Sequence, residues 1–382
     1  MDFELSEEHR MLQRMVRDFA EKEIAPRAEE IDETDEFPWD IFRRMGELGL
    51  LGLPFPEKYG GAGGDYIGQV IVLEEIARVS GSMAITLDAH TSLCCEPIYL
   101  FGSEAQRREY LVPLARGEKV GAFGLTEPQA GSDAGATRTR AVRDDHTNEW
   151  IINGQKIFIT NGSIADVVVI TAKTDPEKGT RGISSFIVEK DAPGFQPGRD
   201  EHKMGLRGSV TSELFFEDCR IPADNLLGTE NEGFKQFLVT LDAGRVAIAA
   251  MAMGLAQGAF ERAAAYARER VQFGQPIAKF QAVQWMIADM ATDIEAARLM
   301  VYRAAHLRKQ GVRFTKEAAM AKLLATEMSE RVCRNAIQIH GGYGYVREYE
   351  VERMYRDQRL CAIGEGTNEI QRLVISRQIL GR

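Results

Sequence analysis

Apolar residues recur at helical spacing through the first third of the chain. After Ser6, a residue able to cap a helix, apolar positions fall every three or four residues as far as Phe19. The same spacing predicts helices over 39–50, 70–79 and 106–115, whereas the glycine-rich run 59–64 is expected to be a loop. Residues 1–120 are therefore predicted to form an N-terminal α-helical domain.

The pattern changes near residue 121, where short β-branched and aromatic runs replace helical spacing. The expected strands are 150–152, 156–160, 167–171, 184–188 and 212–216. The turn signals between them are Asn153-Gly154, Asn161-Gly162 and Pro197-Gly198. Because no segment of helical length intervenes, the prediction for 121–232 is an antiparallel sheet or small barrel, and a parallel nucleotide-binding sheet is disfavoured.

Helical spacing returns at Gly233 and continues to the end. The segments 233–270, 280–310 and 315–340 are long and Ala-rich, and the first is apolar on most faces. Such helices are usually buried inside a bundle or between subunits. We therefore predict a C-terminal domain over 233–382 that resembles a four-helix bundle, and an α+β multidomain fold for the whole chain.

Charge and hydropathy narrow the classes of partner. The chain of 382 residues has 57 acidic and 47 basic side chains, a formal net charge of −10, and no basic block. Nucleic acid and anionic membranes are therefore not expected as partners. The longest strongly apolar stretch, 246–256, is shorter than the ~18 residues that cross a bilayer. With no visible signal peptide, a bacterial-type cytoplasm is expected, or a mitochondrial matrix if a presequence has been removed.

Common catalytic and metal motifs are missing from the sequence. The five cysteines are scattered, which favours reduced, buried thiols, and the six histidines lack ligand spacing, so no metal site is expected. None of the Gly-x-Gly pairs extends to GxGxxG, and neither GxxxxGK nor GxSxG occurs. Rossmann, P-loop and α/β-hydrolase chemistry are therefore unsupported.

Three separated stretches carry a family signature. Residues 122–133 read AFGLTEPQAGSD, residues 156–162 read KIFITNG, and residues 338–344 read QIHGGYG; Arg356-Asp357 and the GEGTNEIQ of 364–371 follow. In order and spacing they resemble the acyl-CoA dehydrogenase family of flavoproteins, in its short- and medium-chain form. The resemblance covers essentially the whole chain.

That resemblance implies a reaction and a catalytic base. Family members remove hydrogens from Cα and Cβ of an acyl-CoA thioester, giving a trans-2-enoyl-CoA and reduced FAD. Glu365 matches the base that takes the Cα proton, while the hydride leaves Cβ for flavin N5. A buried carboxylate is a stronger base than one in water, and Glu365 has no adjacent Lys or Arg in the sequence.

The sequence also allows two other assignments of the base and of this carboxyl. Glu365 is also placed to cap a helix that begins near Thr367. Some relatives instead carry the base just before the Arg of an LDxxR segment, which is residues 241–245 here. Gly244 occupies that alternative position, which leaves Glu365 as the one candidate.

Cofactor and substrate contacts follow from the same resemblance. The implied FAD contacts are Phe123, Leu125, Thr126, Ser132, Phe158, Ile159, Thr160, Arg270, Phe273, Gln281, Gln338, Gly341, Gly342, Thr367 and Glu369. The implied substrate contacts are Ser132, Asp242, Arg245 and Gly366. Taken singly, Phe158 also fits a plain β-core aromatic, Arg270 a solvated helix-end charge, and Arg245 a surface or ion-paired helix residue.

Partners are implied as well. In the family, residues matching Arg270 and Gln281 reach FAD from a neighbouring subunit, so at least a dimer is expected, and commonly a homotetramer built as a dimer of dimers. Electrons would pass to an electron-transfer flavoprotein. Two alternatives stay open: an acyl-CoA oxidase, whose chains are usually much longer, and a catalytically silent homologue, which the intact Glu365 disfavours. Acyl chain length is not resolved, and 90–95 and the region around Gly244 are candidate pocket residues.

Overall fold

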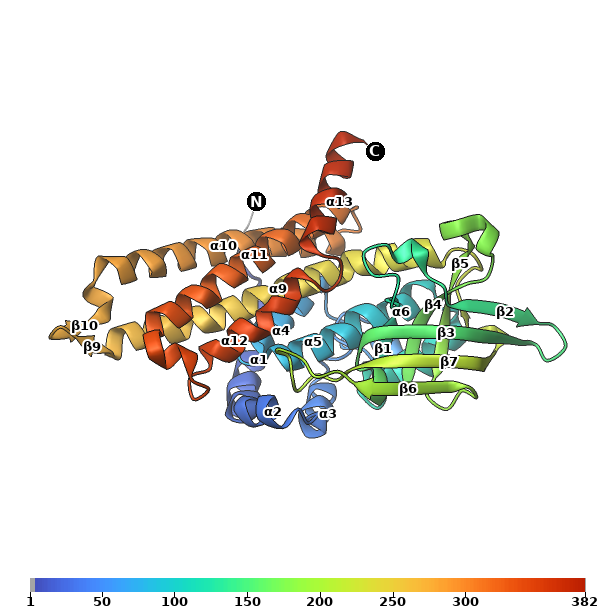
Figure 1. Ribbon diagram of the computed structural model, residues 1–382, viewed down its shortest axis with the longest axis horizontal. Helices are drawn as coiled ribbons and strands as arrows, with labels where there is room; N and C mark the ends of the chain where they lie inside the picture. The colour runs from blue at the N-terminus through green and yellow to red at the C-terminus, as the bar shows by residue number, and fades with distance from the viewer. Residues whose placement is uncertain (1–3, 382) are drawn as a thin grey trace.

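A computed structural model describes residues 4–381 as three consecutive parts, helical, β and helical (Figure 1). The central sheet lies at one end of an elongated molecule, and the C-terminal helices run from beside it to the opposite end (Figure 1). The predicted fold class is confirmed.

The N-terminal part forms as the apolar spacing predicts. Ser6 caps the first helix, its side chain accepting a hydrogen bond from the backbone N–H of His9 at 3.2 Å. The segment 81–101 is also helical, although it shows no amphipathic pattern, because it is buried on nearly every side. The helices are α1 (Glu7–Phe19), α2 (Ala28–Thr34), α3 (Trp39–Glu47), α4 (Tyr66–Ala77), α5 (Gly81–Asp88), α6 (Glu96–Phe101), α7 (Glu104–Gln106) and α8 (Val112–Ala115), with π-helical turns at Ala20–Ile24, Ala89–Cys95 and Arg107–Leu111.

The sheet is mixed, which corrects the prediction of an antiparallel sheet. Its order is β6-β7-β3-β2-β4-β5-β8, and β1 pairs with β4 in parallel, Gly121 opposite Val167. The antiparallel prediction failed because β1 meets β4 only after the β2–β3 hairpin, a long-range pairing that no local pattern marks. The strands are β1 (Gly121–Gly124), β2 (Arg140–Asp144), β3 (Glu149–Thr160), β4 (Val167–Lys173), β5 (Ile183–Glu189), β6 (Phe195–Asp200), β7 (Thr211–Pro222) and β8 (Leu226–Leu227).

Two of the three expected turns lie inside strands. Asn153-Gly154 sits within β3, where the pairing with β7 shifts register and Gly154 has φ +153°. Pro197-Gly198 lies in β6, which forms an edge of the sheet, where a missing N–H is tolerated. Asn161-Gly162 does turn the chain, with Asn161 at φ 64°. The glycine and proline signals were real, but two of them mark a bulge and an edge.

The three long C-terminal helices confirm their predicted ranges. α9 is long and apolar enough, by length and composition alone, to cross a membrane. However, 78% of its apolar 18-residue stretch is buried inside the protein. Its apolarity is therefore explained by packing, chiefly against α4, α10 and α11. The helices are α9 (Gly233–Glu269), α10 (Gln281–Lys309), α11 (Thr315–His340), α12 (Val351–Gln358) and α13 (Asn368–Leu380); a small hairpin of β9 (Val271–Gln272) and β10 (Gln275–Pro276) joins α9 to α10.

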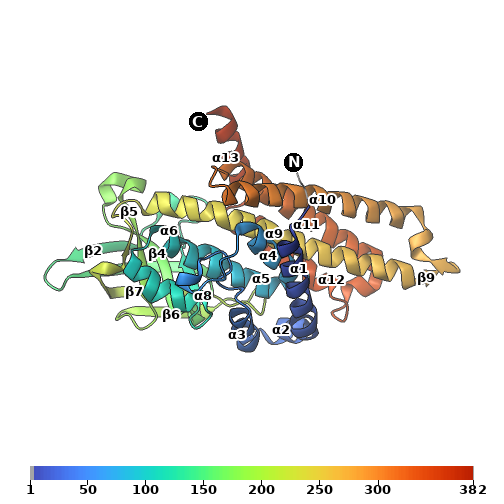
Figure 2. The ribbon, with the colours of Figure 1, turned by 180° about the vertical axis from the view of Figure 1, so that it is seen from behind.

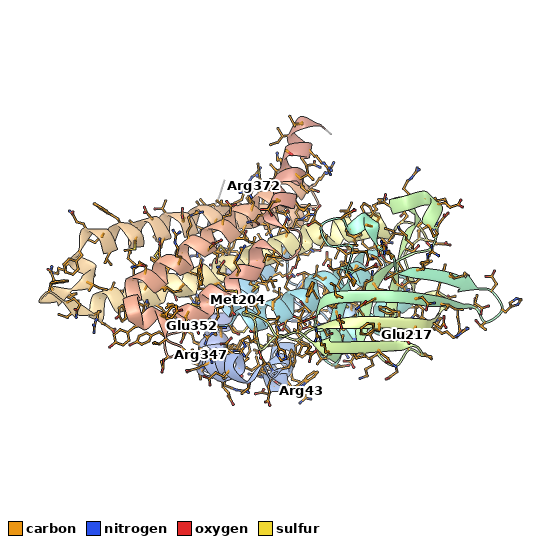
Figure 3. All side chains as sticks on the ribbon, in the orientation of Figure 1. Arg43, Met204, Glu217, Arg347, Glu352 and Arg372 are labelled. Atoms are coloured by element: carbon orange, nitrogen blue, oxygen red, sulfur yellow. The ribbon has the colours of Figure 1, made fainter. Side chains whose placement is uncertain are left out.

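Two hydrogen bonds join α12 to the chain between β6 and β7. The chain between β6 and β7 crosses to the helices, where the backbone N–H of Leu206 donates to Asp357 at 2.6 Å and Arg356 donates to the carbonyl of Met204 at 3.2 Å. Figures 1 and 2 both show α13 projecting from the body of the molecule. Arg372, near the base of α13, pairs with Glu327 on α11 (Figure 3).

Candidate active site

The loop before α13 holds Glu365 in an uncommon backbone conformation. Glu365 has φ +52° and Gly366 has φ +88°. The amide of Gln371 donates to the carbonyl oxygens of Glu365 at 3.4 Å and Gly366 at 2.7 Å, and the Lys322 ammonium donates to Gly366 O at 2.9 Å. A non-glycine residue in the left-handed region persists only where its surroundings hold it there. Here Lys322 and Gln371, from two different helices, do so.

Glu365 does not cap the following helix, so that alternative interpretation is wrong. The cap of α13 is Thr367, whose hydroxyl accepts from the backbone N–H of Ile370 at 3.3 Å. Both carboxyl oxygens of Glu365 are buried, and neither has a hydrogen-bond partner of standard geometry within residues 4–381. Its carboxyl group therefore points into the protein, away from solvent.

The carboxyl of Glu365 lies directly over Gly244 on α9. A Cβ atom added to Gly244 would stand 1.8 Å from Glu365 Oε2 and 2.9 Å from a methyl group of Leu93. No side chain fits there while Glu365 keeps this position. The absence of a side chain at 244 is thus what makes room for the carboxyl at 365.

The surroundings of Glu365 correct one expectation from the sequence. Although no basic residue adjoins it along the chain, Lys322 on α11 and Arg245 on α9 both face it and act to lower its pKa. Burial, the largest effect, and the neighbouring carboxyl of Asp88 outweigh the two cations and raise the pKa of Glu365 well above its usual value. The net result favours a strong base.

Asp88, at the end of α5, is a site residue that the sequence analysis missed. Its side chain is buried, and neither carboxyl oxygen has a hydrogen-bond partner of standard geometry among the described residues. Burial raises its pKa to about 6, against the effects of Glu365, Ser92 and Arg308, which lower it. One signal was present in the sequence: Asp88 is the single acid in the otherwise apolar and hydroxylic run of α5.

The predicted substrate residues fall into three places. Arg245 is only 4% exposed and donates to Asp242 at 2.6 Å, and the Thr315 hydroxyl also donates to Asp242 at 2.6 Å. Arg245 is therefore buried and ion-paired on α9, and its contact with substrate stays a prediction. Ser132 is exposed in the loop after β1, and Gly366 belongs to the Glu365 loop.

One group of expected FAD residues gathers where β1 meets β3. The carbonyl of Thr126 accepts from the backbone N–H of Ile157 at 2.9 Å, and that of Leu125 accepts from the Lys156 ammonium at 3.3 Å. Phe123, at the end of β1, leads into this loop. The loop thus lies beside the strand that carries Phe158, and Thr160 ends that strand.

Phe158 is not a core aromatic, so that alternative is wrong. It is 62% exposed and has φ +57°, at a register shift between β3 and β7. This bulge turns the ring out of the sheet. Ile159 is only 2% exposed, so any contact it makes with a cofactor comes from its backbone.

A second group lies at the far end of the helices. Arg270 ends α9 beside the β9–β10 hairpin, and its guanidinium sits 5.3 Å from the centre of the Tyr343 ring. Arg270, Gly341 and Gly342 line a cavity of about 500 Å³. Phe273 at the hairpin tip is 93% exposed. Gln281 at the start of α10 and Gln338 near the end of α11 are exposed and do not line this cavity.

One chain does not bring the two groups together. Lys322, which holds the Glu365 loop, and Gly341 are 19 residues apart along α11, a separation of about 28 Å at 1.5 Å per residue. Figure 1 shows the sheet and the β9–β10 hairpin at opposite ends. Thr367 and the exposed Glu369 stay beside Glu365, at the start of α13.

The residues of both groups fit a flavin dinucleotide. Phe158 presents an aromatic face suited to stacking on a ring system. At Gly341 and Gly342 an added Cβ would meet nothing within 4 Å, so the backbone is open to close approach beside the cationic Arg270. Aromatic stacking, open backbone and a guanidinium are what a flavin with a pyrophosphate requires.

Comparison with known proteins identifies the family. The chain matches the N-terminal, middle and C-terminal domains of acyl-CoA dehydrogenase over residues 6–118, 122–219 and 231–380. It is 55% identical to a probable acyl-CoA dehydrogenase of Bacillus subtilis, with both chains covered in full, and 52% identical to a short-chain specific acyl-CoA dehydrogenase of Clostridium acetobutylicum, covering 99% of this chain and 100% of the relative. The solved structure of butyryl-CoA dehydrogenase from Megasphaera elsdenii superposes with a TM-score of 0.97 at 45% identity, covering 100% of both chains. The chain therefore belongs to the acyl-CoA dehydrogenase family of FAD-dependent oxidoreductases.

Proposed function

We propose that the protein catalyses α,β-dehydrogenation of a short-chain acyl-CoA, with Glu365 as the base that takes the Cα proton. The observation that carries this proposal is the Glu365 carboxyl, buried over the bare Gly244 in a loop held by Lys322 and Gln371. The short chain length is supported by relatives 45% to 55% identical, three of which are named short-chain specific enzymes.

The residues of this chain would act through base strength and positioning. A Cα–H next to a thioester is weakly acidic, so a carboxylate in water removes it poorly, and burial of Glu365 strengthens the base. The Cα–H bond breaks, a bond to a Glu365 oxygen forms, and the backbone N–H of Glu365 donates to the thioester oxygen as negative charge develops there. When bound, FAD supplies the acceptor for the hydride that leaves Cβ. Phe158, Thr126 and Thr160 would hold the flavin.

We further propose an electron-transfer flavoprotein as the electron acceptor. A 49% identical relative of Acetobacterium woodii is named a subunit of a caffeyl-CoA reductase–Etf complex. A 49% identical chain with a TM-score of 0.98 comes from structural work on the electron transferring flavoprotein of Acidaminococcus fermentans. Oxygen is the alternative acceptor: a solved structure titled a prolyl acyl carrier protein oxidase is 34% identical, with 99% of this chain and 100% of that chain covered.

The reverse reaction is the second candidate. Three relatives are named reductases: an acryloyl-CoA reductase at 49% identity, the caffeyl-CoA reductase subunit and a 3-(aryl)acrylate reductase at 46%. The same residues would serve, with a protonated Glu365 giving its proton to Cα. Equilibration of the enzyme with acyl-CoA and enoyl-CoA pairs at set potentials distinguishes the favoured direction.

An assembly of at least two chains, and commonly a dimer of dimers, belongs to this proposal. It is supported by the separation of the two groups of FAD residues along α11. A neighbouring subunit would bring Arg270 and Gln281 to the flavin held beside Phe158.

The test is Glu365→Gln, assayed by anaerobic bleaching of the flavin with butyryl-CoA. This variant keeps the size and polarity of the side chain but cannot take a proton. We expect FAD content and acyl-CoA affinity to stay near those of the wild type while turnover falls by at least ~10³-fold. Turnover within a few-fold of the wild type would show that another residue is the base.

A further inference from the structure

The buried carboxyl of Asp88 has no role in the chemistry proposed so far. It lies at the C-terminal end of α5, which packs against α9, and it interacts with the carboxyl of Glu365, which lies over Gly244. Two carboxyl groups held together away from water repel each other if both are ionised. Such a buried pair is stable only if something offsets this repulsion.

The hydrogen bonds around the two carboxyls indicate what offsets the repulsion. Within residues 4–381, none of the four carboxyl oxygens of Asp88 and Glu365 has a hydrogen-bond donor of standard geometry. A buried acceptor without a donor is destabilising, because it has lost its hydrogen bonds to water and gained none in return. A proton held between the two carboxyls is itself the donor that is missing, because a protonated carboxyl gives an O–H···O⁻ bond to its neighbour.

Two cations from neighbouring helices face Glu365. Glu365 faces Lys322 on α11 and Arg245 on α9. Arg245 is already paired with Asp242, and Lys322 is held by Gly366 O and Asn368. Within residues 4–381, neither cation donates a hydrogen bond of standard geometry to a carboxyl oxygen of the pair.

The polar neighbours of Asp88 on the side away from Glu365 also have other partners. Arg308 on α10 faces Asp88, but it pairs with Glu96 at 2.5 Å and stands 3.5 Å from the centre of the Tyr66 ring. The Ser92 hydroxyl, which also acts on Asp88, accepts a hydrogen bond from Gln69 at 2.9 Å, and its own O–H makes no bond of standard geometry to either Asp88 oxygen. The two carboxyls are thus left to each other.

We propose that Asp88 is a positioning residue for Glu365: the two carboxyls share one proton in the substrate-free enzyme, and the charge of Asp88 keeps Glu365 a strong base after that proton has left. The inference rests on the proposed function, in which Glu365 is the base. The shared proton departs to solvent before substrate reacts, which leaves both groups ionised. Glu365 then takes the Cα proton while Asp88 stays ionised, and the hydrogen bond between them re-forms.

The first test is the pH dependence of kcat/KM in Asp88→Asn. Removing the negative neighbour lets the proton on Glu365 leave more readily, so the acid limb of the profile should move to lower pH by at least ~1 unit. The weaker base should also lower the plateau kcat about tenfold. Asp88→Glu retains the charge and should keep the wild-type limb. A residue with only a structural role would lower stability and leave the limb in place.

The second test needs no turnover. Infrared spectra of the FAD-loaded, substrate-free enzyme follow the C=O stretch of protonated carboxyls against pH. The last proton of the pair should leave at a pH at least ~1 unit lower in both Asp88→Asn and Glu365→Gln than in the wild type. Glu74→Gln is the control, because Glu74 is also a buried carboxyl but is bonded by Arg298 and Tyr302, and it should leave this band unchanged.

The outcomes separate the two proposals. Glu365→Gln with near-normal turnover would end the proposed function. An inactive Glu365→Gln together with an unmoved limb in Asp88→Asn, or with the same carboxyl midpoint in all variants, would overturn the role of Asp88 alone.

Discussion

Gly244→Ala is the smallest change that tests the geometry of the base. It adds one methyl group to α9, 1.8 Å from Glu365 Oε2 in the present structure. Replacing a mid-helix glycine by alanine normally stabilises a helix by ~0.5–1 kcal/mol. Any loss of function must therefore come from the site and not from a weakened helix.

The size of the effect follows from the clash. Ordinary contact between such atoms begins at 3.4 Å, so the carboxyl of Glu365 must move by at least 1.6 Å, the difference between 3.4 and 1.8 Å. Its backbone cannot easily follow, because Gln371 and Lys322 hold the loop. Misplacing a catalytic group by ~1 Å costs on the order of 10²-fold in rate. We expect kcat/KM of Gly244→Ala to fall at least 100-fold.

The assay is anaerobic flavin reduction by butyryl-CoA, with FAD content and thermal unfolding measured on the same samples. Ala247→Gly, one turn further along α9, is the control: it perturbs the helix about as much in the opposite sense and does not approach Glu365. The control should keep most of its activity. A Gly244→Ala enzyme within threefold of the wild type would refute the placement of the carboxyl over Gly244.

Two further predictions concern other parts of the molecule. Arg270→Ala should weaken FAD retention, seen as flavin lost on gel filtration, while turnover recovers in excess FAD because Arg270 is far from Glu365; an unchanged FAD affinity would remove Arg270 from the site. Burial lowers the pKa of His90 to about 4, so below pH 6.5 the unfolded chain binds a proton that the folded protein does not. We expect stability to fall by about 2 kcal/mol between pH 7 and pH 5 on this account. The test is urea unfolding of His90→Gln, which keeps a hydrogen-bond donor and an acceptor at this position. Its free energy of unfolding should fall less between pH 7 and pH 5 than that of the wild type. An equal fall in both proteins would exclude His90 as the cause.

The sequence predicted those parts of the fold that local patterns control. The long helices α9, α10 and α11 have helical spacing over many turns and formed where expected. The failures were of two kinds. Burial on all sides removes the amphipathic signal, as in α5, and long-range pairing leaves no local trace, as in the parallel contact of β1 with β4.

In the site too, residues marked by a sequence motif were predicted, and residues placed only by packing were missed. Glu365 and Gly244 were predicted from the family motif and its one alternative position, and the structure brings the two into contact. Lys322 and Asp88 were missed because only the packing of α11 and α5 places them beside Glu365. Asp88 left one trace in the sequence, as the lone charged residue of α5, whereas Lys322 left none, because α11 carries several charged residues.

The buried, apolar α9 has a consequence for how the protein is made. During synthesis α4 and α5 are complete before α9 leaves the ribosome, so one side of α9 can be covered at once. Its cover on the other side comes from α10 and α11, and α11 ends 71 residues after α9 does, at positions 340 and 269. At ~5–20 residues per second that interval lasts several seconds. For that time a segment apolar enough for a lipid bilayer is covered on one side only, so its open side exposes apolar surface that can aggregate.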